Sequence, residues 1–161
     1  MLHHGLAGQV QQNLAGQASR PIIKPSDPAY GGRLFRYRSV LNLAAIATTT
    51  FGSTQAGLAT TDWAMLGIIP AGYVFDYGVI TSSVTLGTAV AAIGTSPTHV
   101  SNGQLRAAAT FTTVDTPTLF GLASAQAGAA YAADTPIYLT CATAAIPSAG
   151  TLVIDLYYNK A

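Results

Sequence analysis

Short segments that alternate between apolar and polar side chains constrain the fold of this chain most strongly. Residues 151–158 show the pattern most clearly, because every second side chain is large and apolar: Leu152, Ile154, Leu156 and Tyr158. Near residue 35 the same period places Phe35, Tyr37, Leu41 and Leu43 on one face and Arg36, Arg38, Val40 and Asn42 on the other. A period of two residues predicts β-strands with one buried face.

Eight segments of this kind follow one another along the chain: residues 35–43, 63–69, 73–81, 85–93, 104–113, 118–122, 137–143 and 151–158. Proline, glycine, asparagine and aspartate, the residues that form tight turns, separate them. The alanine-rich segment 123–133 contains Gly128 and favours a loop with a short helix at most. About eight short strands at near-regular spacing predict an all-β fold, an antiparallel sandwich or barrel, and not βαβ units.

Charged residues are scarce, and this independently disfavours a helical fold. They make up 8% of the 161 residues, against about 25% in an ordinary soluble domain, and glutamate is absent. Helix surfaces are normally built from glutamate, lysine, arginine and glutamine. The longest apolar run, residues 64–75, contains Pro70 and is shorter than the roughly 20 residues of a membrane helix, so no membrane association is expected.

The first 32 residues differ from the rest and predict an extended N-terminal assembly arm, followed by a β-sandwich domain over residues 33–161. Residues 1–40 carry five basic side chains and one aspartate, whereas residues 41–161 carry two basic side chains and five aspartates. Pro21, Pro25 and Pro28 favour an extended path. Upstream, apolar residues recur every four positions over residues 6–18, which leaves open a short helix or an unstructured tail.

Known catalytic arrangements are missing from the sequence. Cys141 is the single cysteine, so neither an intrachain disulfide nor a thiolate metal cluster can form. No Gly-x-Ser-x-Gly elbow, phosphate loop or dinucleotide fingerprint occurs. Asp115 and Asp134 precede Thr-Pro and are typical of turns, whereas Asp76 and Asp155 fall within strands, facing outward or pairing with an arginine. We expect no catalytic, metal or cofactor site, and we expect that the chain is not an enzyme.

One basic segment deserves comparison with nucleic-acid platforms. Arg33, Arg36 and Arg38 alternate with Phe35 and Tyr37. Protein β-sheets that bind single-stranded nucleic acid combine basic and aromatic residues on one face. Here the period of two puts the arginines and the aromatic residues on opposite faces of the β-strand. The net negative charge of residues 41–161 also opposes the usual electrostatic footprint. We therefore expect no nucleic-acid partner.

A surface made mainly of threonine, serine, alanine, glycine and glutamine suits close packing against other proteins, because few charges must be desolvated. Such a composition favours a structural subunit over an enzyme.

Three segments carry a resemblance to a known group of proteins. In residues 68–79 an apolar strand ends in Ile-Pro-Ala-Gly and is followed at once by a strand containing an aspartate. Residues 88–95 end in Ile-Gly-Thr, and residues 146–158 form a closing strand after Ile-Pro-Ser-Ala-Gly. In this order the segments resemble small virion proteins of tailed bacteriophages, namely jelly-roll-like capsid decoration (cement) and head-fibre proteins. The resemblance covers roughly residues 60–160.

This resemblance implies a jelly-roll-like β-sandwich that decorates or cements the outer surface of a capsid. Its partners would be the major capsid protein and copies of itself, as a homotrimer or homodimer. An arginine can fork onto a carboxylate where a lysine offers a point charge, so we expect these basic residues to contact the partner: Arg20, Lys24, Arg33, Arg36 and Arg38.

Two alternatives remain open from the sequence. One is a tail, baseplate or head-fibre component. The other is a carbohydrate-binding jelly roll, for which the candidate aromatic residues are Trp63, Tyr73, Tyr77 and Tyr131.

Overall fold

The computed structural model describes residues 34–47, 54–126 and 128–160, and it confirms an all-β fold. A first sheet contains β1 (Leu34–Asn42), β10 (Thr151–Lys160), β5 (Tyr73–Ser82) and β8 (Thr118–Phe120). A second sheet contains β4 (Trp63–Ile69), β9 (Thr135–Ala142), β6 (Val90–Gly94) and β7 (Arg106–Thr110). Shorter elements are the β2 (Ile46–Ala47) and β3 (Thr54–Gln55) pair, helix α1 (Ala123–Gln126) and a 3₁₀ helix (His99–Ser101).

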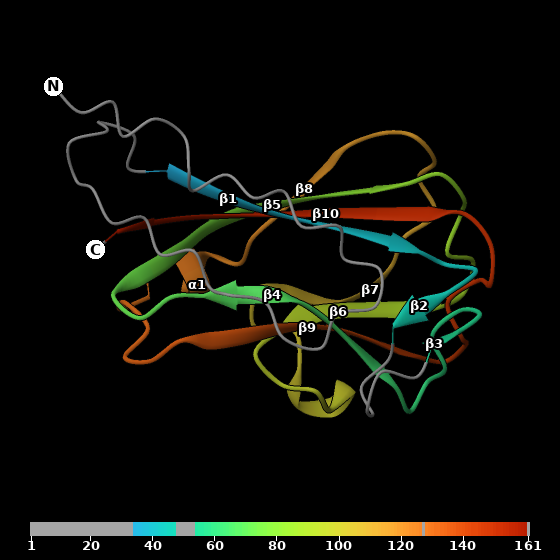
Figure 1. The fold of residues 1–161 in the computed structure, drawn as a ribbon, viewed down its shortest axis with the longest axis horizontal. Helices are drawn as coiled ribbons and strands as arrows, with labels where there is room; N and C mark the ends of the chain where they lie inside the picture. The colour runs from blue at the N-terminus through green and yellow to red at the C-terminus, as the bar shows by residue number, and fades with distance from the viewer. Residues whose placement is uncertain (1–33, 48–53, 127, 161) are drawn as a thin grey trace, which may run out of the picture.

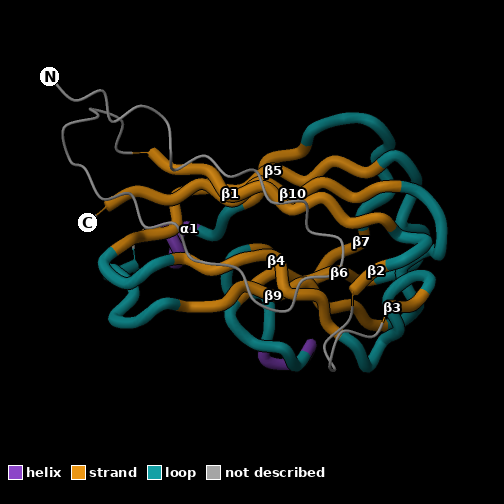
Figure 2. The backbone as a smooth tube through the Cα atoms, viewed as in Figure 1, coloured by secondary structure: helices purple, strands orange, loops and turns teal. Residues whose placement is uncertain are grey.

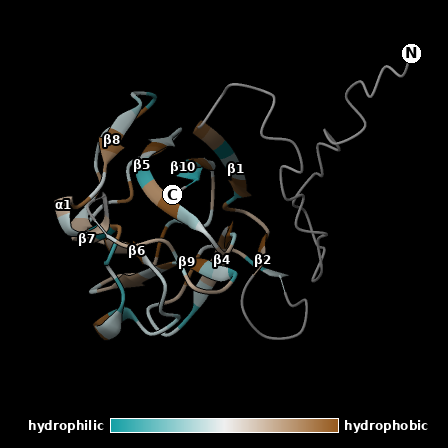
Figure 3. Ribbon diagram, turned by 90° about the vertical axis from the view of Figure 1, so that its left-hand side faces the viewer, coloured by the Kyte–Doolittle hydropathy of each residue, from teal (hydrophilic) through white to brown (hydrophobic). Residues whose placement is uncertain are grey.

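The two four-stranded sheets face each other as a sandwich (Figures 1 and 3). The strand orders are β1-β10-β5-β8 and β4-β9-β6-β7, and every pairing is antiparallel. Among these eight strands the chain changes sheet at each step, except from β6 to β7, which are neighbours in the second sheet. This strand order is that of a jelly roll, as the sequence resemblance implied.

The core lies between the sheets and takes its side chains from alternate strand positions. The first sheet contributes Phe75, Ile80, Leu152, Ile154 and Leu156, each at most 1% exposed. The second contributes Leu66, Ile69, Ile93, Ile137 and Leu139, each fully buried. At one end of the core, Phe35, Tyr73 and Tyr158 form a cluster with ring centroids 5.4–6.0 Å apart. Burial raises the pKa of Tyr158 above its ordinary value.

Strand β1 also links the two sheets. A Cβ atom on Gly67 would lie 2.6 Å from the Tyr37 ring, so the absence of a side chain on β4 lets this ring approach the backbone closely. One residue pair further, the Ser39 hydroxyl donates a hydrogen bond to the Leu66 carbonyl oxygen. The edge strand of the first sheet is thereby tied to the edge strand of the second.

Tight turns connect the strands where the sequence predicted them. Between β4 and β5, Gly72 adopts a φ of 82° and the Tyr73 N–H donates to the Pro70 carbonyl at 3.2 Å. The Asp134 carboxylate accepts a hydrogen bond from the Ala71 N–H at 2.9 Å. Asp115 has a φ of 49°, a backbone conformation that aspartate tolerates better than most residues. The turn roles of both aspartates are confirmed.

The tube view in Figure 2 shows how much of the chain is strand and how short the helices are. Each of the eight predicted segments contains a strand, and α1 confirms the short helix expected after residue 122. The prediction for residues 85–93 is wrong over its first five positions, because Gly87 has a φ of 62° and the Ala89 N–H bonds back to Leu86. The sequence analysis missed β2, β3 and the 3₁₀ helix.

The predicted arm, residues 1–32, lies outside the described residues, and so does its boundary with the sandwich domain. Among the residues that the structure describes, no helix is long and apolar enough to cross a membrane.

Candidate interaction surface

The outer face of the first sheet carries large apolar and aromatic side chains where a solvated sheet face usually carries polar ones. On the edge strands, Val40 of β1 is 48% exposed and Leu119 of β8 is 72% exposed. We call this surface the open face and define it by these residues: Arg36, Arg38, Val40, Asp76, Tyr77, Val79, Thr81, Leu119, Val153, Asp155 and Tyr157. In a chain with so few charges, such a face is the strongest candidate for contact with another protein.

An ion pair occupies the middle of the open face. Arg38 and Asp155 are direct neighbours on β1 and β10, 117 positions apart in sequence. The Arg38 Nε and Nη2 atoms donate to the two Asp155 carboxylate oxygens, each at 2.7 Å. The Asp155 side chain is 7% exposed and the Arg38 side chain 50%. These hydrogen bonds raise the pKa of Arg38, and both charges are compensated before any partner arrives.

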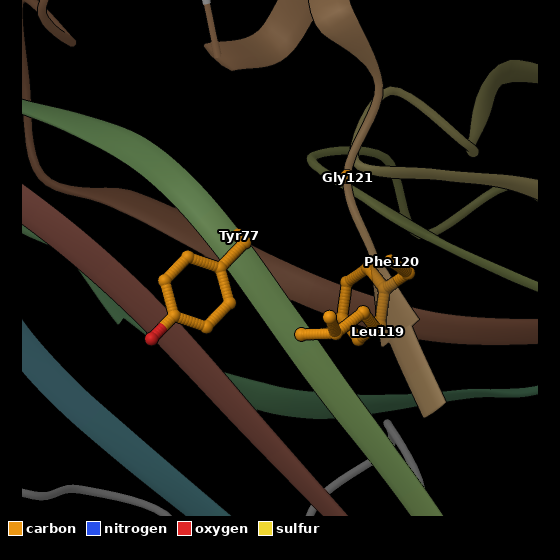
Figure 4. Close-up of a pocket in the computed structure, with 4 residues that line it drawn as sticks. All are labelled: Tyr77, Leu119, Phe120 and Gly121. Carbon is orange, nitrogen blue, oxygen red and sulfur yellow. The ribbon is translucent and has the colours of Figure 1, made fainter. Parts of the chain in front are cut away.

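Two tyrosines form a stacked pair beside this ion pair. Arg36, Tyr157 and Tyr77 lie side by side on β1, β10 and β5. The Tyr77 and Tyr157 rings stack with centroids 4.4 Å apart and an interplanar angle of 15°. Tyr77 also lines a shallow hollow with Leu119, Phe120 and Gly121, as Figure 4 shows. Since Gly121 has no side chain, nothing from that position fills the hollow.

A second shallow depression adjoins the ion pair. The side chains that line it belong to Arg38, Val79, Thr81, Pro117, Val153, Asp155 and Tyr157. The second depression therefore lies on the open face and the first lies at its β8 edge, and both are lined mainly by apolar atoms. The face offers a partner shallow apolar contact and no deep pocket for a small molecule.

A β-bulge adds a second carboxylate to the open face. Tyr157 pairs with Tyr77 but Tyr158 pairs with Phe75, so Asp76 is the extra residue. Phe75 is buried in the core, and Gly78, three positions later, faces Phe120 on the core side. Asp76 and Tyr77 therefore both lie on the outer side. Within the part of the chain that the structure describes, neither Arg36 nor Asp76 forms an ion pair.

The outer face of the second sheet is different, because the segment 95–104 covers part of it. The Asn102 amide group donates to the carbonyl oxygens of Ala92 and Tyr138, both at 3.2 Å, and to the Thr140 hydroxyl at 2.9 Å. The His99 Nδ1 atom lies 3.2 Å from the same hydroxyl. Thr140 is 1% exposed although it points away from the core. We call this surface the covered face and define it by the outward residues of β9 and β6 beneath the segment: Ala92, Gly94, Tyr138 and Thr140.

The five basic residues predicted as partner contacts have different positions. Arg20, Lys24 and Arg33 lie outside the described residues, so their role stays a prediction. Arg36 is exposed on the open face. Arg38 lies on the same face but is already bonded to Asp155, as the sequence analysis allowed for an aspartate within a strand. Tyr157 and Leu119 were not predicted from the sequence, and Tyr77 was considered there only for sugar binding. For Tyr157 the available signal was that residues 151–158 place large side chains on both strand faces.

The four aromatic residues considered for sugar binding do not form one site. Trp63 lies on the second sheet and packs edge-on against Tyr138 at 4.9 Å. Tyr77 lies on the first sheet. Tyr73 is 7% exposed in the core, and Tyr131 packs against the core, where burial raises its pKa. The groove of exposed aromatics that this alternative requires is therefore not formed by these four.

Reactive groups are dispersed in the described part of the chain. No three histidine, cysteine or aspartate side chains there come together in a way that could hold a metal ion. Cys141 is fully buried, its thiol contacts the Leu58 carbonyl at 3.2 Å, and burial raises its pKa. That thiol packs as a small apolar side chain. The expectation that the chain is not an enzyme stays a prediction.

Comparison with known proteins gives a likeness in structure and none in sequence. No family model and no curated protein matches the chain. A chain in the cyanophage Pam1 capsid asymmetric unit aligns with a TM-score of 0.58 and 14% identity, over 95% of this chain and 99% of that one. A chain in the capsid of Ralstonia phage GP4 aligns with a TM-score of 0.54 and 15% identity, over 80% and 83%. At the level of the fold, these alignments confirm the resemblance to phage virion proteins.

Proposed function

We propose that the chain is a structural protein of a phage virion that decorates the outside of the capsid and cements neighbouring subunits of the shell. The observation that carries this proposal is the fold comparison with the Pam1 capsid, which covers nearly the whole of both chains. A chain of that capsid and this chain therefore have the same overall architecture with no large domain left over.

The character of the surface supports the same function. The open face is apolar, its central ion pair is internally compensated, and both of its depressions are shallow. Contact with a protein over a broad area suits such a face better than turnover of a small substrate. A cement protein needs this kind of face, because each copy must add contact area between neighbouring subunits.

The basic N-terminal segment supplies a second means of attachment. Arg20, Lys24 and Arg33 belong to the region where basic residues outnumber acidic ones five to one. On an acidic capsid surface these side chains would form charge-assisted contacts that weaken as salt is added. The major capsid protein is the partner proposed for them.

A tail, baseplate or head-fibre component would share the fold and the composition but not the stoichiometry. A cement protein covers the shell in many copies, whereas a fibre or baseplate component is present in few. Copy number per particle therefore separates the two.

The test uses purified particles of the phage that encodes the chain. Gel densitometry against the major capsid protein should give a ratio that corresponds to many copies per particle, and particles stripped of the chain should melt at a lower temperature. A ratio of a few copies would replace the cement function with a tail or fibre function. A chain absent from particles would overturn the proposal.

The contribution of the arm is tested on stripped particles with the full-length chain. Replacing Arg20, Lys24 and Arg33 together by serine should lower the NaCl concentration at which the bound protein is released. Lys160→Ser, a change of exposed charge at the C-terminal end of β10, serves as the control and should leave release unchanged. Equal release of the triple variant and the unmodified chain would contradict the proposed arm contacts.

A further inference from the structure

We propose that a second copy of this chain pairs with the open face about a two-fold axis that runs along β10, with Arg36 of each copy bonded to Asp76 of the other. This inference goes beyond the proposed function, because it names the surface and the residues through which copies associate. Its test needs the purified chain alone and no particle.

The positions of Arg36 and Asp76, which form no ion pair within the described residues, carry the inference. Arg36 is on β1 and Asp76 is on β5, and these strands flank β10 on its two sides. Arg36 is level with Tyr157 and Tyr77, and Asp76 is one residue beyond Tyr77. The two charges are therefore nearly level along the strands and about 10 Å apart across them, which is two strand spacings.

Consider a two-fold axis that runs parallel to β10 and lies in the plane between the two copies. Rotation about this axis exchanges the positions of β1 and β5, the two strands that flank β10. It lays β1 of one copy over β5 of the other, while β10 lies over β10. Arg36 of one copy is thereby placed opposite Asp76 of the second copy, and the symmetry repeats this contact. Such an isologous interface gives Arg36 and Asp76 a partner and forms the contact twice, whereas within the described residues of one copy neither of them forms an ion pair.

The other side chains of the three overlapping strands fit this arrangement, whereas Leu119 of β8 lies beside the contact. Val153 and Tyr157 lie on the axis strand and would meet their own equivalents. Val40 of one copy would lie over Thr81 of the other, because both are level with Val153. Asp155 also lies on the axis strand and would face its own equivalent, each carboxylate being bonded to Arg38 of its own copy. Arg38 of one copy would lie over Val79 of the other, because both are level with Asp155. The contact therefore has an apolar, compensated centre with its free charges to the sides, which is the usual anatomy of a protein interface.

The size of the face sets the strength of the pairing. Three overlapping strands, about 4.8 Å apart and about 30 Å long, cover roughly 450 Å² per copy and about 900 Å² in total. This is below the 1,200–2,000 Å² of stable interfaces, so the pairing should be weak, with a dissociation constant on the order of tens of micromolar. Copies held close together on a shell would associate far more readily than copies free in solution.

Sedimentation velocity of the full chain between about 1 and 200 µM tests the pairing. The unmodified chain should shift from monomer to dimer across this range. Arg36→Asp and Asp76→Arg should each weaken dimerisation by at least tenfold, because each change places like charges opposite one another twice. The combined Arg36→Asp and Asp76→Arg chain should dimerise within about threefold of the unmodified chain, since the exchange restores both contacts. Circular dichroism should show that all variants are folded.

Several outcomes would overturn the pairing. A chain that stays monomeric throughout the range would do so, as would a trimer, because a face that meets itself about a two-fold axis gives dimers. Equal dimerisation of both single variants and the unmodified chain would exclude the open face. A monomer that still decorates particles would overturn the pairing and leave the proposed function standing, whereas a dimer absent from particles would do the reverse.

Discussion

The outer faces of the two sheets differ in whether another segment of the chain covers them. On the second sheet, Asn102 and His99 bring the segment 95–104 onto the strands and bury Thr140 beneath it. On the first sheet, Val40 and Leu119 remain 48% and 72% exposed. The two faces also differ in composition, because the covered face carries small residues such as Ala92 and Gly94, whereas the open face carries valine, leucine, arginine and aspartate.

This difference indicates how an interaction face can be recognised: no described segment forms hydrogen bonds across it. The segment 95–104 is held on the covered face by hydrogen bonds from the Asn102 side chain to carbonyl oxygens of the strands, which are thereby satisfied beneath it. On the open face the two central charges, Arg38 and Asp155, are satisfied by each other within the sheet itself. An apolar surface with its central charges already paired is ready for a partner that brings few charges of its own.

The largest effect is expected where the loop approaches the covered face most closely. A Cβ atom on Gly94 would lie 2.5 Å from the Asn102 Oδ1 atom and 2.8 Å from the backbone nitrogen of Gln104. Gly94→Val should therefore displace the segment and lower the free energy of unfolding by about 3 kcal/mol, as overpacking does. Chemical denaturation measures this change.

The control for that experiment is Ala107→Val, an exposed position on the same sheet. It should change the free energy of unfolding by less than about 0.5 kcal/mol. A Gly94→Val chain as stable as this control would show that the segment does not rest on the sheet.

The next effect concerns the ion pair of the open face. Arg38→Ala should lower the free energy of unfolding by about 2 kcal/mol, because the carboxylate of Asp155 is 7% exposed and would lose its partner. Arg36→Ala, two residues away on the same face of β1, removes an exposed charge with no ion pair in the described residues and should cost less than about 0.5 kcal/mol.

Adding Asp155→Asn to Arg38→Ala should recover part of the lost stability, since the buried charge is then removed as well. Equal stabilities of Arg38→Ala and Arg36→Ala would contradict the view that the central charges of the open face are committed to each other.

Much of the fold could be predicted from sequence, because one buried face imposes period two on each strand. Residues 151–158 show this well, and β10 follows that prediction closely. Residues 85–89 were wrongly predicted as part of a strand because threonine, leucine and alanine continue the apolar pattern of β6. The positive φ of Gly87 turns the backbone there and prevents an extended strand. The strands β2 and β3 have two residues each, too few to show any period.

The candidate site was harder to predict, because its members come from four strands distant in sequence. A lone Asp155 within a strand indicated an outward or paired carboxylate, but its partner is 117 positions away. Leu119 and Tyr77 become neighbours only through the antiparallel pairing of β5 with β8. The bulge that brings Asp76 to the outer side depends on a register shift that no local pattern signals.

The smallest signal is expected from Cys141, which should react very slowly with thiol reagents in the native chain. This thiol is fully buried on the core side of β9 and burial raises its pKa, so it holds its proton at neutral pH and is not the reactive thiolate. A thiol reagent at pH 7.5 should label it more than a hundredfold more slowly in the native chain than in denaturant. Rapid labelling of the native chain would show that the core opens readily.

Because Cys141 is expected to be silent, an introduced thiol can report directly whether the open face is buried in the assembled particle. Val40→Cys probes the open face, and Val100→Cys, at a position 93% exposed on the 3₁₀ helix, probes the segment above the covered face. Each variant is labelled as a dilute free chain and again when bound to particles. Binding to particles should slow labelling at position 40 at least tenfold and leave position 100 reactive. Equal labelling rates at position 40 in the free and bound chain would contradict this prediction.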